Sequence, residues 1–278
     1  MSPPIATPRS RALGFGLRKA RMARGYGLRE LARATDMYPA ELSNWELGLR
    51  VPKVEEVALL LGQLRVGAEE RKRLLELAEH AREPNWLEAT VAPDVAAHAE
   101  FERAATAVFT WQPILMPGLL QTEDYIRALV ALPRRTREEI ERLTAVKLTR
   151  QERLRGADRL GYSVLLGESA LRRGFGGPAV MAEQLRRLLA AMNRENIGLR
   201  ILPATEHGHP GMWGSFSILE FAALPPIVFL EQYQGSVYLY DDDQVAAYRA
   251  AAGSMTSLAL SEPDSAQLLR EVLAELEA

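Results

Sequence analysis

Two short hydrogen-bonding side chains, Ser43 and Asn44, are neighbours in a stretch with helical spacing. In D-M-Y-P-A-E-L-S-N-W-E-L-G-L-R-V-P, residues 36–52, the apolar Leu42 and Trp45 are three positions apart and share one face of a helix. Ser43 and Asn44 then point elsewhere, where a hydroxyl and an amide can form hydrogen bonds. A short helix with a narrow buried face and an uncharged polar outer face suits the floor of a DNA groove.

Residues with special backbone preferences mark the ends of this helix. Pro39 fits the first turn, where its missing N–H costs nothing. Gly48 supplies a left-handed stop, and Asp36 precedes the helix as a turn residue that tolerates a left-handed backbone. The sequence therefore predicts a helix over 39–47. Further helices are expected from Leu13 to before Gly25 and over 28–34, 54–64 and 69–82, which together make a compact all-α domain of five helices.

The composition is that of a water-soluble protein with two domains. A chain of 278 residues is long for one domain. It has no apolar run of about 18 residues, so we expect no membrane span. The absence of cysteine excludes disulfides, thiolate metal sites and a cysteine nucleophile, and it fits a cytoplasmic protein. The first residues, MSPPIATPRS, lack an apolar signal core, and we expect residues 1–12 to form a flexible arm.

Charge is distributed unevenly along the chain. Residues 1–53 hold ten Lys/Arg and four Asp/Glu, a net charge of +6, whereas the whole chain carries −2, so the remainder carries −8. A basic head on an acidic body points to a polyanionic partner for the head. The alternative is that the arginine-rich helices are merely solvated.

The order of residues around the predicted helices resembles a known family. The pattern L-R-x-A-R-x-x-x-G-x-x-x-x-E-L-A, a four-residue turn and L-S-x-W-E-x-G-x-R-x-P, within residues 13–64, is similar to cro/cI-type helix-turn-helix regulators of the xenobiotic-response-element family. The resemblance implies that helix 39–47 is the recognition helix and lies in the major groove. Helix 28–34 would cross the DNA backbone.

Residue roles follow from this resemblance. Asn44 is the best candidate for reading a base, because an amide can pair bidentately with adenine. Arg21 and Glu46 stand where the family has a buried Arg–carboxylate pair, which would orient the recognition helix. The residues assigned to DNA are Tyr38, Pro39, Ala40, Ser43, Asn44, Arg50 and Lys53, the last two for phosphate.

The sequence departs from the family pattern in three places. Gly27 and Leu28 replace a small polar cap and a glutamine, so one phosphate contact is in doubt. Asp36 stands where the turn usually has glycine. Pro39 and Ala40 offer only apolar contact, such as with a thymine methyl, so we expect specificity to depend on few bases and on DNA shape.

The second part of the chain is predicted to be an α+β domain. Residues 83–93, EPNWLEATVAP, carry two prolines and form a predicted linker. A helix is expected from Asp94 to about Thr110, and the apolar stretch 111–120 is either core or a partner groove. About five strands follow within a domain over 94–278. They are expected over 160–166, 199–202, 214–222, 227–233 and 237–240.

This part also resembles a known domain. The stretches MPGLLQTEDYIRAL, GESALRRGFGGPAVMAEQLRRL, ILPATEHGHPGMWGSFSILEF and LALSEPDSAQLLREV are similar to the C-terminal regulatory domain of antitoxin-like regulators. The resemblance implies pairing with a small toxin-like protein or the sensing of a small-molecule effector.

No catalytic, cofactor-binding or metal site is assigned from the sequence. His207 and His209 could present two imidazoles to zinc only if a carboxylate completed the site. We therefore expect a DNA-binding transcriptional regulator, a homodimer and not an enzyme, bound to double-stranded operator DNA. The alternatives are a protein-interaction module with vestigial DNA binding and an enzyme with a DNA-binding head.

Overall fold

The computed structural model describes residues 8–81, 91–132, 135–222, 224–232 and 235–278. The chain divides into two compact units, of which the first comprises residues 1–104 with 232–238 and the second 105–231 with 239–278. No helix within the described ranges is both long and apolar enough to cross a membrane.

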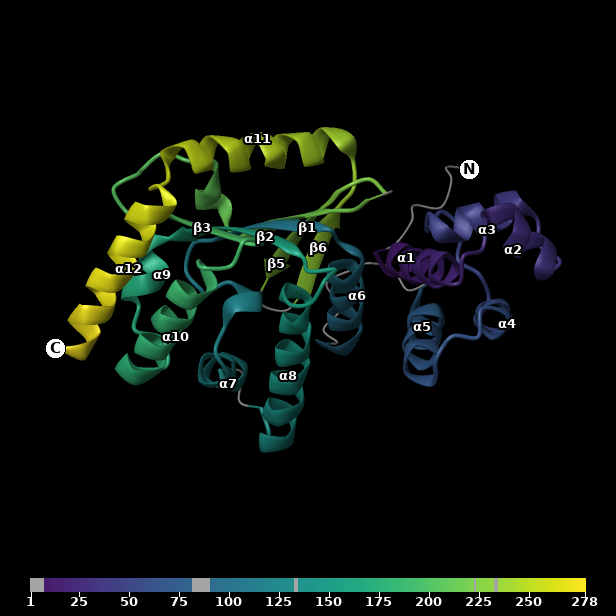
Figure 1. The fold of residues 1–278 in the computed structure, drawn as a ribbon, viewed down its shortest axis with the longest axis horizontal. Helices are drawn as coiled ribbons and strands as arrows, with labels where there is room; N and C mark the ends of the chain where they lie inside the picture. Colours follow the sequence, from purple (N-terminus) through teal and green to yellow (C-terminus); the bar gives the residue numbers. More distant parts are fainter. Residues whose placement is uncertain (1–7, 82–90, 133–134, 223, 233–234) are drawn as a thin grey trace. The chain divides into compact units, whose positions relative to one another are not determined.

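The first unit is helical, as predicted. Helix α1 is its centre and contacts α3, α5 and α6. Along α1, Leu13 and Leu17 are fully buried, so this helix forms much of the core. The helices are α1 (Pro8–Ala23), α2 (Leu28–Ala34), α3 (Pro39–Glu46), α4 (Val54–Gln63), α5 (Ala68–His80) and α6 (Val91–Ala104) (Figure 1).

The start of the first helix differs from the sequence prediction. Helix α1 begins at Pro8, so residues 8–12 of the predicted arm are helical; Ala12 is fully buried. Residues 1–7 of that arm and 82–90, which include most of the predicted linker, lie outside the described residues. Helix α6 packs on α1 through an edge-on contact of Phe15 with Phe101, with ring centroids 5.3 Å apart.

The second unit is built on a mixed sheet. The strand order of the sheet is β3-β2-β1-β4-β5-β6, in which most of β6 falls within residues 232–238 of the first unit. β1 pairs in parallel with β2, and β2 with β3, whereas β4 is antiparallel to both β1 and β5. The strands are β1 (Ala107–Gln112), β2 (Gly161–Gly167), β3 (Ile197–Leu202), β4 (Phe216–Glu220), β5 (Ile227–Gln232) and β6 (Gly235–Leu239).

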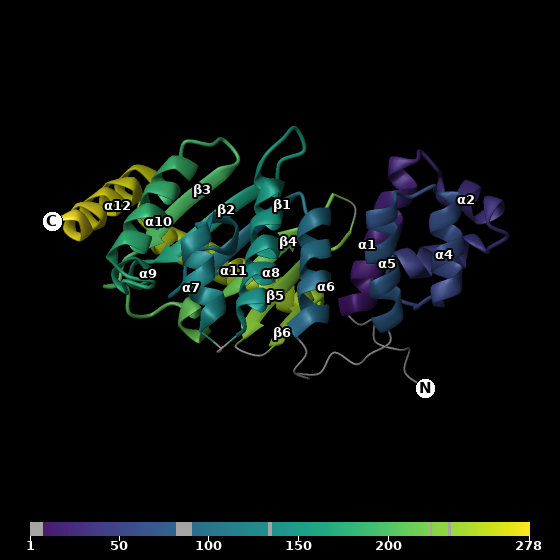
Figure 2. The ribbon, with the colours of Figure 1, turned by 90° about the horizontal axis from the view of Figure 1, so that it is seen from below.

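Helices cover both faces of this sheet. Helix α11 lies on one face, and α7, α8 and α10 lie on the other (Figures 1 and 2). On the α11 side, Val245 and Met255 pack into one apolar cluster with Trp111, Phe216 and Ile218 of the strands. The helices of this unit are α7 (Glu123–Ala131), α8 (Arg137–Arg150), α9 (Glu168–Arg172), α10 (Pro178–Ala191), α11 (Asp242–Leu258) and α12 (Glu262–Glu277), with the 3-10 turns η1 (Gly118–Leu120), η2 (Gln151–Leu154) and η3 (Pro210–Trp213).

The sheet has one strand more than the five expected. β1 occupies the predicted end of a helix and the start of the predicted apolar loop, so that prediction is wrong. β1 lies between β2 and β4 with helices over both faces of the sheet, so its sequence AVFTWQ lacks the simple alternation of a half-exposed strand. The following apolar stretch is largely core, because Met116, Leu119 and Leu120 are buried.

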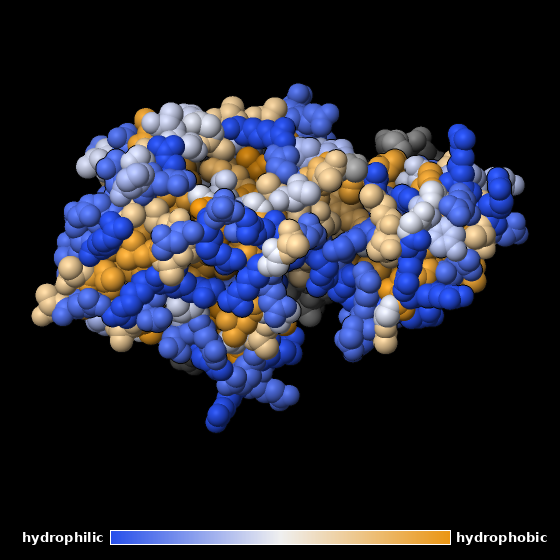
Figure 3. Space-filling model, in the orientation of Figure 1, coloured by the Kyte–Doolittle hydropathy of each residue, from blue (hydrophilic) through white to orange (hydrophobic). Residues whose placement is uncertain are grey.

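The visible surface of both units is mostly hydrophilic, with apolar side chains showing between charged ones (Figure 3).

Candidate nucleic-acid interface

The turn between α2 and α3 is closed by local hydrogen bonds. The Thr35 hydroxyl donates to the Leu31 carbonyl over 2.9 Å, and the Met37 N–H donates to the Ala32 carbonyl over 2.8 Å. Asp36 adopts a left-handed backbone with φ of 55°, a conformation that short polar residues tolerate better than most. The turn therefore forms without the glycine that the family pattern has at this position.

Helix α3 packs on the core through the two apolar residues that share its inner face. Leu42 is fully buried and Trp45 is 3% exposed. Gly48 follows with φ of 69°, which ends the helix in the left-handed conformation expected of it. Trp45 is thus a core residue and does not offer a stacking surface.

The end of α3 lies unusually close to α1. A Cβ atom added at Gly14 would lie 2.6 Å from the carbonyl oxygen of Glu46 and would also meet the carbonyl of Trp45. The Ser10 hydroxyl donates to the Gly48 carbonyl over 2.9 Å. This close approach was not predicted, although the two glycines in the helical stretch A-L-G-F-G-L are a signal for it.

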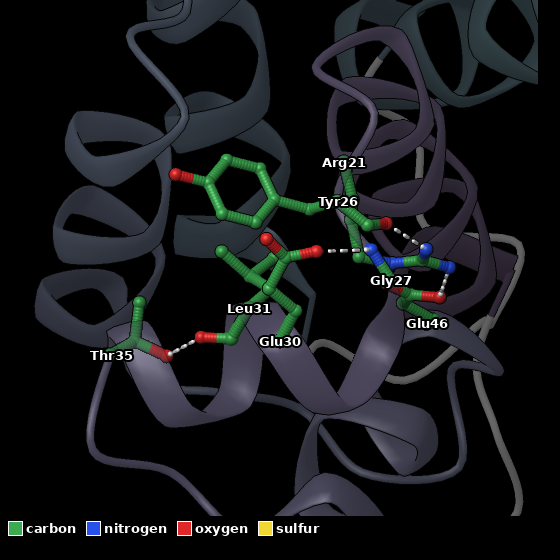
Figure 4. Close-up of polar contacts among 7 residues, drawn as sticks. All are labelled: Arg21, Tyr26, Gly27, Glu30, Leu31, Thr35 and Glu46. Atoms are coloured by element: carbon green, nitrogen blue, oxygen red, sulfur yellow. Dashed lines mark hydrogen bonds and ion pairs between the residues drawn. The ribbon is translucent and has the colours of Figure 1, made fainter.

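Arg21 of α1 and Glu46 of α3 form a bidentate ion pair (Figure 4). Nε and Nη2 of Arg21 donate to the two carboxylate oxygens of Glu46 over 2.6 and 2.8 Å. Nη1 donates to the Tyr26 carbonyl over 2.8 Å, so one guanidinium joins α1, α3 and the turn before α2. The hydrogen bond to Glu46 raises the pKa of Arg21, and both side chains are nearly excluded from water. The pair therefore fixes the orientation of α3.

The outer surface of α3 carries the residues that were assigned to base contacts. Tyr38 is 80% exposed, Pro39 and Ala40 are exposed, and Ser43 and Asn44 are half-buried. Among the described residues, the Asn44 side-chain amide has no hydrogen-bond partner. That amide is available to a ligand.

The backbone of Asn44 also organises the turn after α3. Its carbonyl accepts hydrogen bonds from the N–H groups of Leu49 and Arg50 over 2.9 and 3.3 Å. Arg50 and Lys53 are both exposed, and the Lys53 N–H donates to the Glu56 carboxylate over 2.6 Å. The structure thus brings the candidate base reader and the first candidate phosphate ligand into one hydrogen-bonded segment. Leu49, 46% exposed beside them, was not singled out from the sequence.

The start of α2 differs from the family pattern as the sequence indicated. Gly27 has no side chain to cap the helix, and its N–H donates instead to the Glu30 carboxylate over 3.3 Å (Figure 4). The exposed cations of this helix are Arg29 and Arg33. Any phosphate contact at this end must come from these arginines or from backbone N–H groups.

The two histidines considered for zinc lie in the second unit. His209 packs edge-on against Trp111 with ring centroids 5.6 Å apart, and His207 is exposed. Within the described ranges, no group of three or more His, Asp or Glu side chains is placed to hold a metal ion.

Two family models match this chain. The model described as "Helix-turn-helix" matches residues 17–70, which include α2, the turn and α3. The model described as "Domain of unknown function (DUF5753)" matches residues 95–271. No curated protein and no solved structure matches the chain. The N-terminal match identifies a DNA-binding helix-turn-helix, and the second match spans more than half of the sequence. The chain therefore belongs to the family of the DUF5753 domain, here joined to an N-terminal helix-turn-helix.

Proposed function

We propose that this protein is a sequence-specific transcriptional regulator that acts as a homodimer and inserts α3 into the major groove of operator DNA. The single observation that carries the proposal is the arrangement of α3: its inner face is locked to α1, and its outer face presents Asn44 in one segment with Arg50. A rigid reading helix with an available amide and an adjacent exposed cation has both parts of DNA recognition, base readout and phosphate binding.

Selection from random DNA with the full-length protein tests this function directly. A dimer should enrich two half-sites separated by about one helical turn, roughly 10 base pairs. If Arg50 and Lys53 of each subunit hold one phosphate each, about four phosphates are neutralised and the logarithm of affinity should fall with the logarithm of salt with a slope of about −3.6. The absence of any enriched sequence at low salt would contradict the proposal.

Two substitutions should separate base readout from phosphate binding. Asn44→Ala should reduce discrimination between the selected site and its variants by about 1–3 kcal/mol, with little change in non-specific affinity. Arg50→Ala should weaken binding to all sequences alike and make the salt slope shallower by about 1.8 for the dimer. Both effects are measurable by fluorescence anisotropy at several salt concentrations.

A matched control is Lys72→Ala, which removes an exposed cation from α5 and should leave the slope nearly unchanged. If Asn44→Ala instead lost the same affinity on every sequence, Asn44 would be a backbone contact and not a base reader.

We further propose that the DUF5753 domain controls this DNA binding, either by pairing with a small toxin-like protein in an antitoxin-like role or by sensing a small-molecule effector. Regulation in the cytoplasm, and not catalysis, is the proposed role of the whole chain. An effector-responsive domain behind a DNA-binding head provides a way to bias operator binding, because a ligand that prefers one state of the protein shifts the population of that state.

A further inference from the structure

A polar groove opens in the second unit among α7, α8 and α10. Its volume is about 830 Å³, within the range of small-molecule sites. It is lined by the start of α7, by the end of α8 with η2, and by one side of α10 from Glu183 to Ala190. All of these segments belong to one compact unit, so the groove is a feature of the DUF5753 domain itself.

Buried amides hold the segments around the groove in place. Gln184 of α10 is fully buried; its Nε2 donates to the Leu120 carbonyl over 2.8 Å, and its Oε1 accepts from the Thr122 N–H over 2.8 Å. Gln151 is 6% exposed and donates to the Gln121 carbonyl over 2.7 Å. These bonds join three separate parts of the chain, so the groove is preorganised.

One buried acceptor at this groove has no partner. Gln121 lines the groove and is 3% exposed. Its Nε2 donates to the Met116 carbonyl over 2.9 Å, but its Oε1 forms no hydrogen bond within the described part of the chain. A buried acceptor without a donor is costly, so this atom is open to an N–H or O–H of a bound molecule or of water.

A cation with unused donors lies beside this acceptor. Arg187 is held by its Nε bond to the Leu120 carbonyl, 3.1 Å, and by its Nη2 bond to Gln151 Oε1, 2.7 Å. These bonds leave Nη1 for a ligand. Burial, together with the nearby charges of Arg155 and Arg194, lowers the pKa of Arg187. In the described ranges none of these three arginines has a carboxylate partner, so an anion would relieve their mutual repulsion.

Acidic residues on the rim restrict the charge of the ligand. Glu123 and Glu183 line the groove but are paired with Arg127 and Arg186. Asp124 and Glu152 also line it and are exposed. A polyanion would be repelled by these carboxylates, whereas a compact single anion placed against Arg187 would avoid them.

We propose that this groove binds a small organic anion that carries a hydrogen-bond donor next to one carboxylate or phosphate group. The anion lies against Arg187 and Arg155, and the donor is accepted by Gln121 Oε1. This inference rests on the proposed sensing role of the DUF5753 domain, for which it names the class of effector.

Binding of matched small probes to the full-length protein tests the inference without DNA. N-acetylglycine has an amide N–H beside its carboxylate, and N-acetylsarcosine has a methyl group in place of that hydrogen. We expect saturable binding in calorimetry or ligand-detected NMR, with N-acetylglycine about fivefold tighter. Phosphoethanolamine and phosphocholine are the matching pair with a phosphate, because trimethylation of the amine removes its N–H donors. The pair whose donor-bearing member binds more tightly shows whether the groove prefers a carboxylate or a phosphate.

Two variants assign the contacts. Arg155 is exposed, and its side chain has no partner in the described structure. Arg155→Gln should weaken the binding of both members of each probe pair about fivefold or more, and it should keep the preference for the member that carries the donor. Gln121→Met should abolish the preference. Arg159→Gln is the control, because Arg159 is also an exposed arginine of this unit but pairs with Glu195 and does not line the groove.

The inference is overturned if no probe binds saturably, or if Arg155→Gln and Arg159→Gln bind the probes equally well. If Gln121→Met does not fold, the comparison of Arg155→Gln with Arg159→Gln still decides the anion contact. Failure of these experiments leaves operator binding untouched, since that is measured separately by selection and salt dependence.

Discussion

Glu46→Ala is expected to destabilise the first unit by about 3–5 kcal/mol, because it leaves the Arg21 guanidinium buried without its carboxylate. The side chains of Arg21 and Glu46 are 11% and 4% exposed, so solvent cannot replace the lost partner. The chain has two compact units, and one unfolding transition would mix their stabilities. Hydrogen exchange of the α1 and α3 amides measures the opening of this unit separately.

A double substitution separates the cost of an orphaned charge from the value of the pair. Arg21→Met with Glu46→Leu removes both charges and keeps similar volume, so it should regain most of the stability that Glu46→Ala loses. The DNA affinity of the double variant should remain reduced, because the guanidinium that joins α1 to α3 and to the Tyr26 carbonyl is removed. Full recovery of operator binding would show that the pair does not orient α3.

The control for the single substitution is Glu55→Ala, which removes an exposed carboxylate from the first turn of α4. Surface changes of this kind stay within about 0.5 kcal/mol. A loss for Glu46→Ala no larger than that for Glu55→Ala would mean that the buried pair contributes nothing measurable.

The elements around α3 could be predicted because their signals are local. Pro39 and Gly48 fix the ends of α3 through their own backbone preferences, and Leu42 with Trp45 fix its buried face through a spacing of three. The meeting of Arg21 with Glu46 is different, because 25 positions separate them and nothing local links them. Only the resemblance to a family indicated that pair.

Prediction from the sequence failed where long-range contacts decide the structure. β1 is flanked by strands on both sides, so its apolar run could not be told from the end of a helix. The groove of the second unit depends on Gln121, Gln151 and Gln184, which come from three separate segments. No spacing in the sequence predicts that a glutamine is buried, because glutamine is mostly an exposed residue. This network could therefore be identified only from the folded structure.

Gly14→Ala is expected to destabilise the first unit and weaken binding to all DNA, although alanine favours a helix over glycine by about 1 kcal/mol. The added Cβ would lie 2.6 Å from the Glu46 carbonyl oxygen and would also meet the Trp45 carbonyl. Both are backbone atoms at the end of α3, and neither can rotate away as a side chain could. The helices must separate, at a cost of about 1–3 kcal/mol or more.

The sign of this change distinguishes close packing from helix propensity. Gly253→Ala in α11 is the matched control, because nothing lies within 4 Å of the Cβ position there, and it should stabilise its own unit by up to about 1 kcal/mol. Hydrogen exchange of α1 and α11 would report the two changes separately. Opposite signs are expected; stabilisation by both alanines would mean that α1 and α3 can move apart freely. In that case Gly14 would have no part in holding α3, and the orientation of Asn44 and Arg50 would depend on the Arg21–Glu46 pair and on the buried Leu42 and Trp45.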